Sequence, residues 1–263
     1  MKNTYFDEND KIIKKGYSLV ICEKPEAAKK IAEALSNNTY RTKKVTDSVV
    51  FNLNYKGKEL VICSALGHLY KIKLAKTQSK LSIFDYSWIP INKPKNKAVI
   101  INSKINLIKL LSKDAKEFIL ACDLDQEGET IGYNILKYAC NEKQKIAKRV
   151  KFSTLTEKDI KNAFSNMEKH IDINLAIAGR TRHAIDCMYG INISKALSLA
   201  FMSYSNKYRT LSIGRVQGPT IAYVVENDLQ IKTHVPLPFW SINAYIETTE
   251  NGKTTWLKIK YKK

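Results

Sequence analysis

No stretch of this 263-residue sequence approaches the roughly 20 consecutive apolar residues that a membrane-spanning helix needs. Residues 1–17 are polar and carry charges of both signs, which excludes the apolar core of a secretory signal. These two absences predict a cytoplasmic protein with no membrane partner. Because 44% of the residues are hydrophobic and 10% are aromatic, the chain can bury a core, which excludes global disorder.

Two kinds of cofactor motif are also missing. The five cysteines form no C-x-x-C pair and no cluster, which excludes a disulfide framework and a structural zinc site. No G-x-G occurs, so the dinucleotide-binding fingerprint is absent. Gly252-Lys253-Thr254 is similar to the end of a phosphate-binding loop, but Glu247 stands where that loop requires glycine.

Acidic residues are scarce relative to basic ones. The chain has 44 Lys and Arg against 25 Asp and Glu, a formal net charge of +19. Such an excess attracts polyanions, of which nucleic acid and anionic membranes are the common examples. The alternative is a generally lysine-rich composition with no functional meaning.

Apolar runs and helical patterns alternate over residues 16–154, which predicts an α/β domain with a mainly parallel sheet. Residues 71–98 are rich in lysine, contain Pro90 and Pro94, and predict an extended surface excursion. Strands are expected at 18–22, 47–55, 58–64, 117–123 and 149–154, and helices at 26–35, 105–113 and 132–140.

The remaining chain changes character. Residues 156–230 have a helical pattern that opens with Thr156 as the N-cap. Residues 238–263 return to strand alternation, with Asn251-Gly252 as a hairpin turn. We therefore divide the chain into an arm (1–15), an α/β domain (16–154), a helical domain (155–235) and a short β segment (236–263).

The most distinctive segment carries four carboxylates within seven residues, Asp123, Asp125, Glu127 and Glu129. Carboxylates this close repel one another at a partly shielded strand end unless a cation lies among them. In an extended segment Asp123, Asp125 and Glu127 point to one side, and such hard oxygen ligands suit Mg²⁺. The alternative is a solvated acidic loop.

A calcium-binding EF-hand does not fit this segment. Asp123, Asp125 and Gly128 fall on positions 1, 3 and 6 of such a loop. Asn134, however, stands at position 12, where a bidentate glutamate is required, and the preceding residues predict a strand rather than a helix.

Glu23 follows the first predicted strand as Asp123 follows a later one. Since the carboxyl ends of parallel strands meet at one edge, both side chains can reach one crevice. A glutamate beside a Mg²⁺ cluster can transfer a proton to or from a phosphate ester. The alternative is a carboxylate that complements a helix dipole.

Two segments together resemble the Toprim domain of type IA DNA topoisomerases: Glu23-Lys24-Pro25 with its Ala-rich helix, and the acidic motif 123–129. Asp-x-Asp alone also fits Toprim primases and nucleases, whereas the extension through Glu127-Gly128-Glu129 and Ile131-Gly132 resembles the type IA enzymes. Further segments match in the family's order, closest to archaeal members: Gly67-His68-Leu69, 178–186, 211–220 and 235–240.

This resemblance implies a fold and a site. The fold is a Rossmann-like parallel sheet with helices on both faces, then a mainly helical DNA-binding domain and the first strands of an incomplete arch. Glu23, Asp123, Asp125 and Glu127 are implied to be catalytic and to hold Mg²⁺. A groove for single-stranded DNA is implied at His68, Arg180, Arg182, Asp186, Ser212, Ile213, Gly214, Arg215, Val216 and Gln217. For Arg180 and Asp186, exposed helix charges are the alternative.

Members of this family cleave one DNA strand with a tyrosine, pass a second strand and religate. That tyrosine belongs to a Pro-Arg-Thr-type motif beyond the segment where this chain ends. Tyr208-Arg209-Thr210 lacks the proline and is not assigned as the nucleophile. We therefore expect a truncated or split enzyme that is inactive alone.

With a second polypeptide carrying the arch and the tyrosine, the resemblance implies a nucleoid-associated enzyme that relaxes negatively supercoiled DNA. Two alternatives stay open. One is a Toprim nuclease or primase-like enzyme, which needs no second chain. The other is a non-catalytic module that binds single-stranded DNA irrespective of Mg²⁺.

Overall fold

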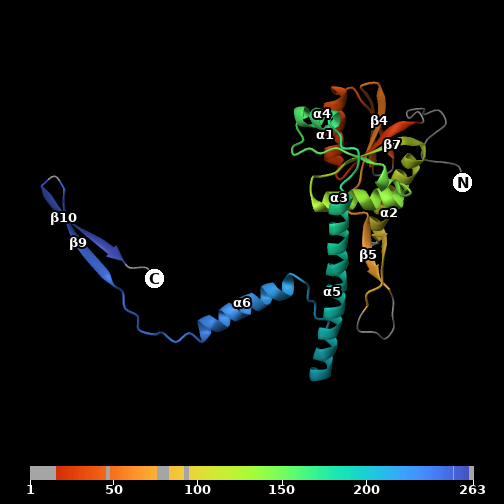
Figure 1. Ribbon diagram of the computed structural model, residues 1–263. Coiled ribbons are helices and arrows are strands. Elements are labelled where there is room, and N and C mark those ends of the chain that lie inside the picture. Colours follow the sequence, from red (N-terminus) through yellow and green to blue (C-terminus); the bar gives the residue numbers. More distant parts are fainter. Residues whose placement is uncertain (1–15, 46–47, 76–82, 92–94, 251, 261–263) are drawn as a thin grey trace. The chain divides into compact units, whose positions relative to one another are not determined.

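The computed structural model describes residues 16–45, 48–75, 83–91, 95–250 and 252–260 (Figure 1). The expected arm at 1–15 lies outside the described residues. The chain forms two compact units, one ending at Gly214 and one starting at Arg215, and each is described by itself. None of the described helices combines the length and apolar character that a bilayer crossing demands.

A six-stranded sheet forms the centre of the first unit, in the order β2-β3-β4-β1-β7-β8. β1 pairs in parallel with β4 and β7, and β8 adds in parallel to β7. β2 and β3 attach in antiparallel fashion, so the sheet is parallel around β1, as predicted. The strands are β1 (Tyr17–Cys22), β2 (Arg41–Val45), β3 (Ser48–Tyr55), β4 (Lys58–Ser64), β7 (Ala115–Ala121) and β8 (Lys148–Arg149).

Helices cover both faces of this sheet, which confirms the predicted α/β class. Leu19 and Ile21 of β1 pack in one apolar cluster with α2 (Lys95–Asp114) and α3 (Gln126–Asn134). The alternate residues Val20 and Cys22 pack in a second cluster with α1 (Pro25–Ser36) and α4 (Glu157–Ser165). A strand buried on both faces has no polar side, which is why residues 18–22 read as a continuous apolar run.

The predicted surface excursion at 71–98 is wrong in part. β5 (Tyr70–Leu74) and β6 (Tyr86–Pro90) pair in antiparallel fashion, and α2 begins at Lys95. Tyr70 and Leu74 are buried while Lys71 and Lys73 are exposed, so the lysines occupy the outer side of a pleated strand. Residues 76–82 and 92–94 of this stretch lie outside the described residues.

Three further boundaries differ from expectation. β2 was not expected, because its sequence RTKKV is charged; it lies at the edge of the sheet, where such residues are tolerated. The strand expected at 149–154 is only the two residues of β8. The helix expected at 132–140 begins six residues earlier as α3 and continues as the π-helical turn η1 (Ile135–Ala139).

Thr156 caps α4 as predicted, with its side chain accepting a hydrogen bond from the Asp159 amide. The helix α5 (Ile173–Ser205) follows, capped by Asp172. The second unit contains α6 (Gln217–Lys232) and the antiparallel pair β9 (Asn243–Glu250) and β10 (Lys253–Lys260). The pairing of Lys253 with Glu250 agrees with the expected turn, of which Asn251 lies outside the described residues.

Candidate functional site

The carboxyl ends of β1, β4 and β7 meet at one edge of the sheet. Glu23 follows β1, and the main chain after β4 is fastened to it: the Ala65 amide donates to the Cys22 carbonyl at 2.9 Å and the Gly67 amide to the Glu23 carbonyl at 3.3 Å. Gly67 has a φ of +76°, a conformation that favours glycine. This tight turn delivers His68 to the same edge as the acidic segment that follows β7.

The acidic segment is extended only as far as Asp125. Asp125 is the N-cap of α3, and its Oδ1 accepts a hydrogen bond from the Gly128 amide at 2.6 Å. Glu127 and Glu129 therefore lie in the first helical turn, where carboxylates complement the helix dipole. The expectation that Asp123, Asp125 and Glu127 alternate along one extended strand is wrong, because the helix begins before Glu127.

Glycine is required at position 128 for a steric reason. A Cβ atom there would overlap the main-chain carbonyl of Asp123. The first turn of α3 thus lies directly against the acidic loop, and this contact holds Asp123 close to the helix N-terminus.

Lys24 joins the two carboxylates that follow β1 and β7. Its Nζ lies 2.7 Å from Asp123 Oδ2 and 3.4 Å from Glu23 Oε1. The hydrogen bond to Asp123 and the charge of Glu23 raise the pKa of Lys24. Glu23 and Asp123, 100 positions apart in the sequence, are therefore within reach of one cation, as the parallel-sheet argument predicts.

Glu127 lies between two histidines. Its Oε2 is 2.8 Å from His68 Nε2 and 2.9 Å from His183 Nε2, and Arg182 Nη1 lies 3.9 Å from its Oε1. Partial burial raises the pKa of Glu127, but the hydrogen bonds from His183 and His68 more than offset this, so the pKa lies below its usual value. His183 of α5 is a site residue that the sequence argument did not single out.

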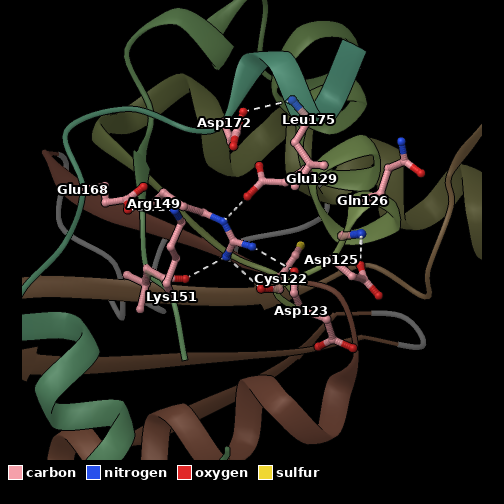
Figure 2. A network of polar contacts seen from close by, with 12 residues as sticks. Cys122, Asp123, Asp125, Gln126, Glu129, Arg149, Lys151, Glu168, Asp172 and Leu175 are labelled. Atoms are coloured by element: carbon pink, nitrogen blue, oxygen red, sulfur yellow. Dashed lines mark hydrogen bonds and ion pairs between the residues drawn. The ribbon is translucent and has the colours of Figure 1, made fainter. Parts of the chain in front are cut away.

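A second omission is the buried ion pair between Arg149 of β8 and Glu129 of α3 (Figure 2). Arg149 Nε lies 2.5 Å from Glu129 Oε1, and both side chains are fully buried. The guanidinium also donates to the carbonyls of Cys122 at 2.7 Å and Asp123 at 2.8 Å. Of the four clustered carboxylates, Glu129 is thus buried and directed toward Arg149, whose guanidinium lies between it and the main chain at Cys122 and Asp123 (Figure 2). The signal available in the sequence was an arginine at the first position of the strand predicted at 149–154.

The exposed carboxylates fit Mg²⁺ by their chemistry. Mg²⁺ prefers hard oxygen ligands, keeps several waters and needs only one or two protein carboxylates. Asp123 and Glu127 are 39% and 40% exposed and so accessible to a hydrated ion, and Glu23 lies at the same edge. Asp125 has one oxygen engaged as the helix cap.

Arg180 fastens α5 to α3. Its guanidinium lies over the rings of Trp88 at 4.5 Å and Tyr133 at 5.0 Å, and it donates to Asn134 and to Tyr138 Oη. Arg182, two residues further along α5 and so on a different side of the helix, is more exposed, and its Nε lies 3.9 Å from Asp186 Oδ2. Arg182 is therefore the better placed of the two expected arginines to meet an external phosphate.

The segment around Ser212 is held along α5 by two serines. The Ser194 hydroxyl accepts from the Ile213 amide at 3.0 Å and donates to the Ile213 carbonyl at 3.2 Å. The Ser198 hydroxyl accepts from the Leu211 amide at 2.9 Å. Ser212, Ile213 and Gly214 therefore belong to the unit that contains the acidic edge. Arg215, Val216 and Gln217 belong to the second unit, in which Gln217 opens α6.

Comparison with known proteins adds two family matches. Residues 18–155 match the Toprim domain family, and residues 170–263 match the DNA topoisomerase family.

Curated relatives agree with these matches. The chain is 41% identical to DNA topoisomerase 1 of Pyrococcus horikoshii over 235 residues, covering 89% of this chain and 34% of the relative. It is 44% identical to DNA topoisomerase 1 of Methanocaldococcus jannaschii, covering 88% and 30%. With DNA topoisomerase 3 of Bacillus thuringiensis it shares 32% identity, covering 91% and 31%. The chain thus spans about a third of the length of these relatives.

Proposed function

Because the chain belongs to the type IA DNA topoisomerase family, with a Toprim domain and an adjoining segment, we propose that it is the metal- and DNA-binding part of such an enzyme. The observation that carries this proposal is the approach of Glu23 and Asp123 to one cation at the carboxyl edge of the sheet. The proposed activity of the complete enzyme is relaxation of negatively supercoiled DNA by transient cleavage of one strand.

Asp123 and Glu127, together with Glu23 and Asp125, are the proposed Mg²⁺-binding residues. Bound there, Mg²⁺ supplies positive charge to the phosphate that reacts. Lys24 already provides one positive charge at this position, since it lies between Asp123 and Glu23. The chain's own contribution is to hold these groups at fixed positions, through the cap of α3 and the pair of Arg149 with Glu129.

Glu23 is the proposed proton-transfer residue. The tyrosine hydroxyl loses its proton to solvent as its oxygen forms a bond to phosphorus, the bond from phosphorus to the 3′ oxygen breaks, and that oxygen takes a proton from Glu23. Religation runs the same steps in reverse, with Glu23 as the base. The Glu23 side chain is 13% exposed, so it is largely shielded from solvent but still accessible at the carboxyl edge of the sheet.

DNA is proposed to bind as a single strand, through Arg182, Arg215 and Gln217 with Ser212 and its neighbours. Arginines that contact phosphates bind without strong sequence preference. Replacing Arg215 with Ala should weaken the binding of all single-stranded oligonucleotides about equally. Affinity should fall steeply with salt, at a slope of roughly 0.7 per phosphate contact. Arg41→Ala on the far edge strand β2 is the matched control, and an equal loss there would contradict the assignment.

A second polypeptide segment that carries the arch and a nucleophilic tyrosine is the proposed partner. Purified alone, this stretch of chain should not form a covalent adduct with labelled single-stranded DNA on denaturing electrophoresis. Mixed with that segment and Mg²⁺, it should form the adduct and relax supercoiled plasmid. Glu23→Ala should abolish both, whereas Glu33→Gln on the outer side of α1 should abolish neither.

The same gel separates the proposal from its alternatives. A covalent adduct that maps to Tyr208 or another tyrosine of this chain would overturn the need for a second segment. Cleavage by this chain without an adduct would instead indicate a Toprim nuclease. Equal DNA binding with and without Mg²⁺, and no reaction with any partner, would indicate a non-catalytic binding module.

A further inference from the structure

The cluster of His68, Glu127 and His183 has a donor set unlike that of the acidic residues beside it. His68 comes from the turn after β4, Glu127 from the first turn of α3 and His183 from α5. Their ligand atoms, two imidazole nitrogens and one carboxylate oxygen, all lie within 4.8 Å of one another. In the part of the chain that the structure describes, no other group of three such side chains converges this closely.

We propose that these three residues form a site for a divalent transition-metal ion such as Zn²⁺ or Co²⁺, which shares Glu127 with the proposed Mg²⁺ site and adds two histidines that the Mg²⁺ site does not use. Imidazole nitrogens suit Zn²⁺ and its neighbours, whereas Mg²⁺ prefers oxygen ligands. Two histidines and one glutamate are a known donor set for zinc sites that keep their fourth position open to water.

The geometry is close to what such an ion needs. Nitrogen and oxygen ligands lie about 2.0–2.2 Å from Zn²⁺, so neighbouring donors in a tetrahedron are roughly 3.4 Å apart. Glu127 Oε2 now lies 2.8 Å from His68 Nε2 and 2.9 Å from His183 Nε2. Each of these two pairs must therefore separate by only about half an ångström, and the ligand atoms of the two histidines lie within 4.8 Å of each other. The side chains are 26%, 40% and 34% exposed, which leaves room for this movement and for entry of the ion.

The surroundings hold the ligands in place. The ring centroids of His68 and His183 lie 4.9 Å apart, and those of Trp88 and His183 lie 6.1 Å apart. Arg180, three residues before His183 on the same helix, contacts the rings of Trp88 of β6 and Tyr133 of α3 and so fixes the position of α5. An ion bound here would link α5 directly to the loop after β4 and would occupy Glu127, which would then be withheld from Mg²⁺.

Co²⁺ titration of the purified chain, freed of any histidine tag and treated with a chelator, tests the proposal. Tetrahedral Co²⁺ gives strong visible absorption that six-coordinate Co²⁺ lacks. We expect this absorption to saturate near one equivalent and to disappear when Zn²⁺ is added. His68→Gln and His183→Gln should each weaken binding by more than the roughly 10-fold that loss of an outer partner costs.

The chain offers matched controls. His170, on the exposed surface of the same unit, can be changed to Gln without touching the cluster. Asp123→Asn removes a Mg²⁺ ligand while leaving all three donors. Both variants should keep the wild-type Co²⁺ spectrum and affinity. Circular dichroism checks that the histidine variants are folded, and Zn²⁺ should raise the melting temperature of the wild type but not of the His68→Gln/His183→Gln double variant.

Three results would overturn the site. They are a tetrahedral spectrum that persists in the double histidine variant, a loss caused equally by His170→Gln, and wild-type Co²⁺ binding that is no tighter than that of Glu127→Gln.

Discussion

Arg149 and Glu129 form a fully buried ion pair, with Nε 2.5 Å from Oε1, next to the loop that carries Asp123 (Figure 2). Burying two charges is costly, and here the cost is offset because the guanidinium also donates to the carbonyls of Cys122, Asp123 and Val150. The pair ties the end of β7 to the start of α3. The positions of Asp123, Asp125 and Glu127 therefore depend on an ion pair in which their own carboxylates take no part.

Arg149→Ala should lower the free energy of unfolding by about 3–5 kcal/mol, because Glu129 is left buried and unpaired. Urea denaturation measures this loss. Lys151→Ala is the matched control, since Lys151 and Glu168 form a half-exposed pair at 2.7 Å in the next part of the chain. That change should cost no more than about 1 kcal/mol. Similar losses in the two variants would contradict the supporting role of Arg149.

Asp125→Ala should destabilise the chain by about 1 kcal/mol, because it removes the side-chain cap on the Gly128 amide. Asp125→Asn should restore most of that stability, since its amide oxygen can accept the same hydrogen bond. Thermal unfolding of the two variants measures the difference. If the alanine variant were the more stable, relief of repulsion between carboxylates would outweigh the cap.

Gly179→Ala should loosen the contact between α5 and α3. The added methyl group would overlap the Thr130 side chain and approach Gln126, and such overpacking costs typically 1–3 kcal/mol. Gly190 of the same helix has only the Ile213 carbonyl nearby, at 3.8 Å, so Gly190→Ala is the control and should be tolerated. Denaturant unfolding of both variants tests this, and equal effects would contradict it.

The lowered pKa of Glu117 in β7 should make the free energy of unfolding depend on pH. Partial burial raises the pKa of Glu117, but bonds from Lys148 and Ser18 and the charge of Lys58 more than offset this, so the pKa lies below the ordinary 4.5. The carboxylate therefore stabilises the fold above the ordinary pKa, and this contribution is lost as the pH falls through the lowered value. Glu117→Gln should cost about 1 kcal/mol at neutral pH and little once the pH is below the lowered pKa of Glu117. A difference that stayed constant over this range would contradict the assignment.

The sequence predicted the parallel part of the sheet because burial on both faces leaves an unmistakable apolar run, as in β1 and β4. It also placed Glu23 and Asp123 at one edge, since strand ends in a parallel sheet share a side. It missed β2, whose charged residues lie at an edge. It put the start of α3 too late, because Gln126-Glu127-Gly128-Glu129 has no apolar periodicity until Ile131.

The sequence did not predict the roles of His183 and Arg149, and the physical reason is the same for both residues. His183 and Arg149 acquire their roles from partners far away in the sequence, Glu127 at 56 positions and Cys122 at 27. Local patterns carry no information on such pairs. Arg180 was expected from the resemblance to meet DNA, and its stacking on Trp88 became visible only when β6 and α5 were seen side by side.

The hydrogen bonds of Ser194 with Ile213 and of Ser198 with Leu211 form because the spacing of four residues along a helix is close to that of two residues along an extended chain. Four residues of helix advance about 6 Å. Two residues of extended chain advance about 6.6 Å. Two serines one turn apart on α5 are therefore spaced to meet two amides that are two residues apart in the neighbouring segment. The Leu211 amide donates to Ser198 and the Ile213 amide donates to Ser194. Inserting one residue between Ser194 and Ser198, or between Leu211 and Ile213, would move one of these amides away from its serine oxygen. The length of one turn of α5 therefore determines how residues 211–213 lie along the helix.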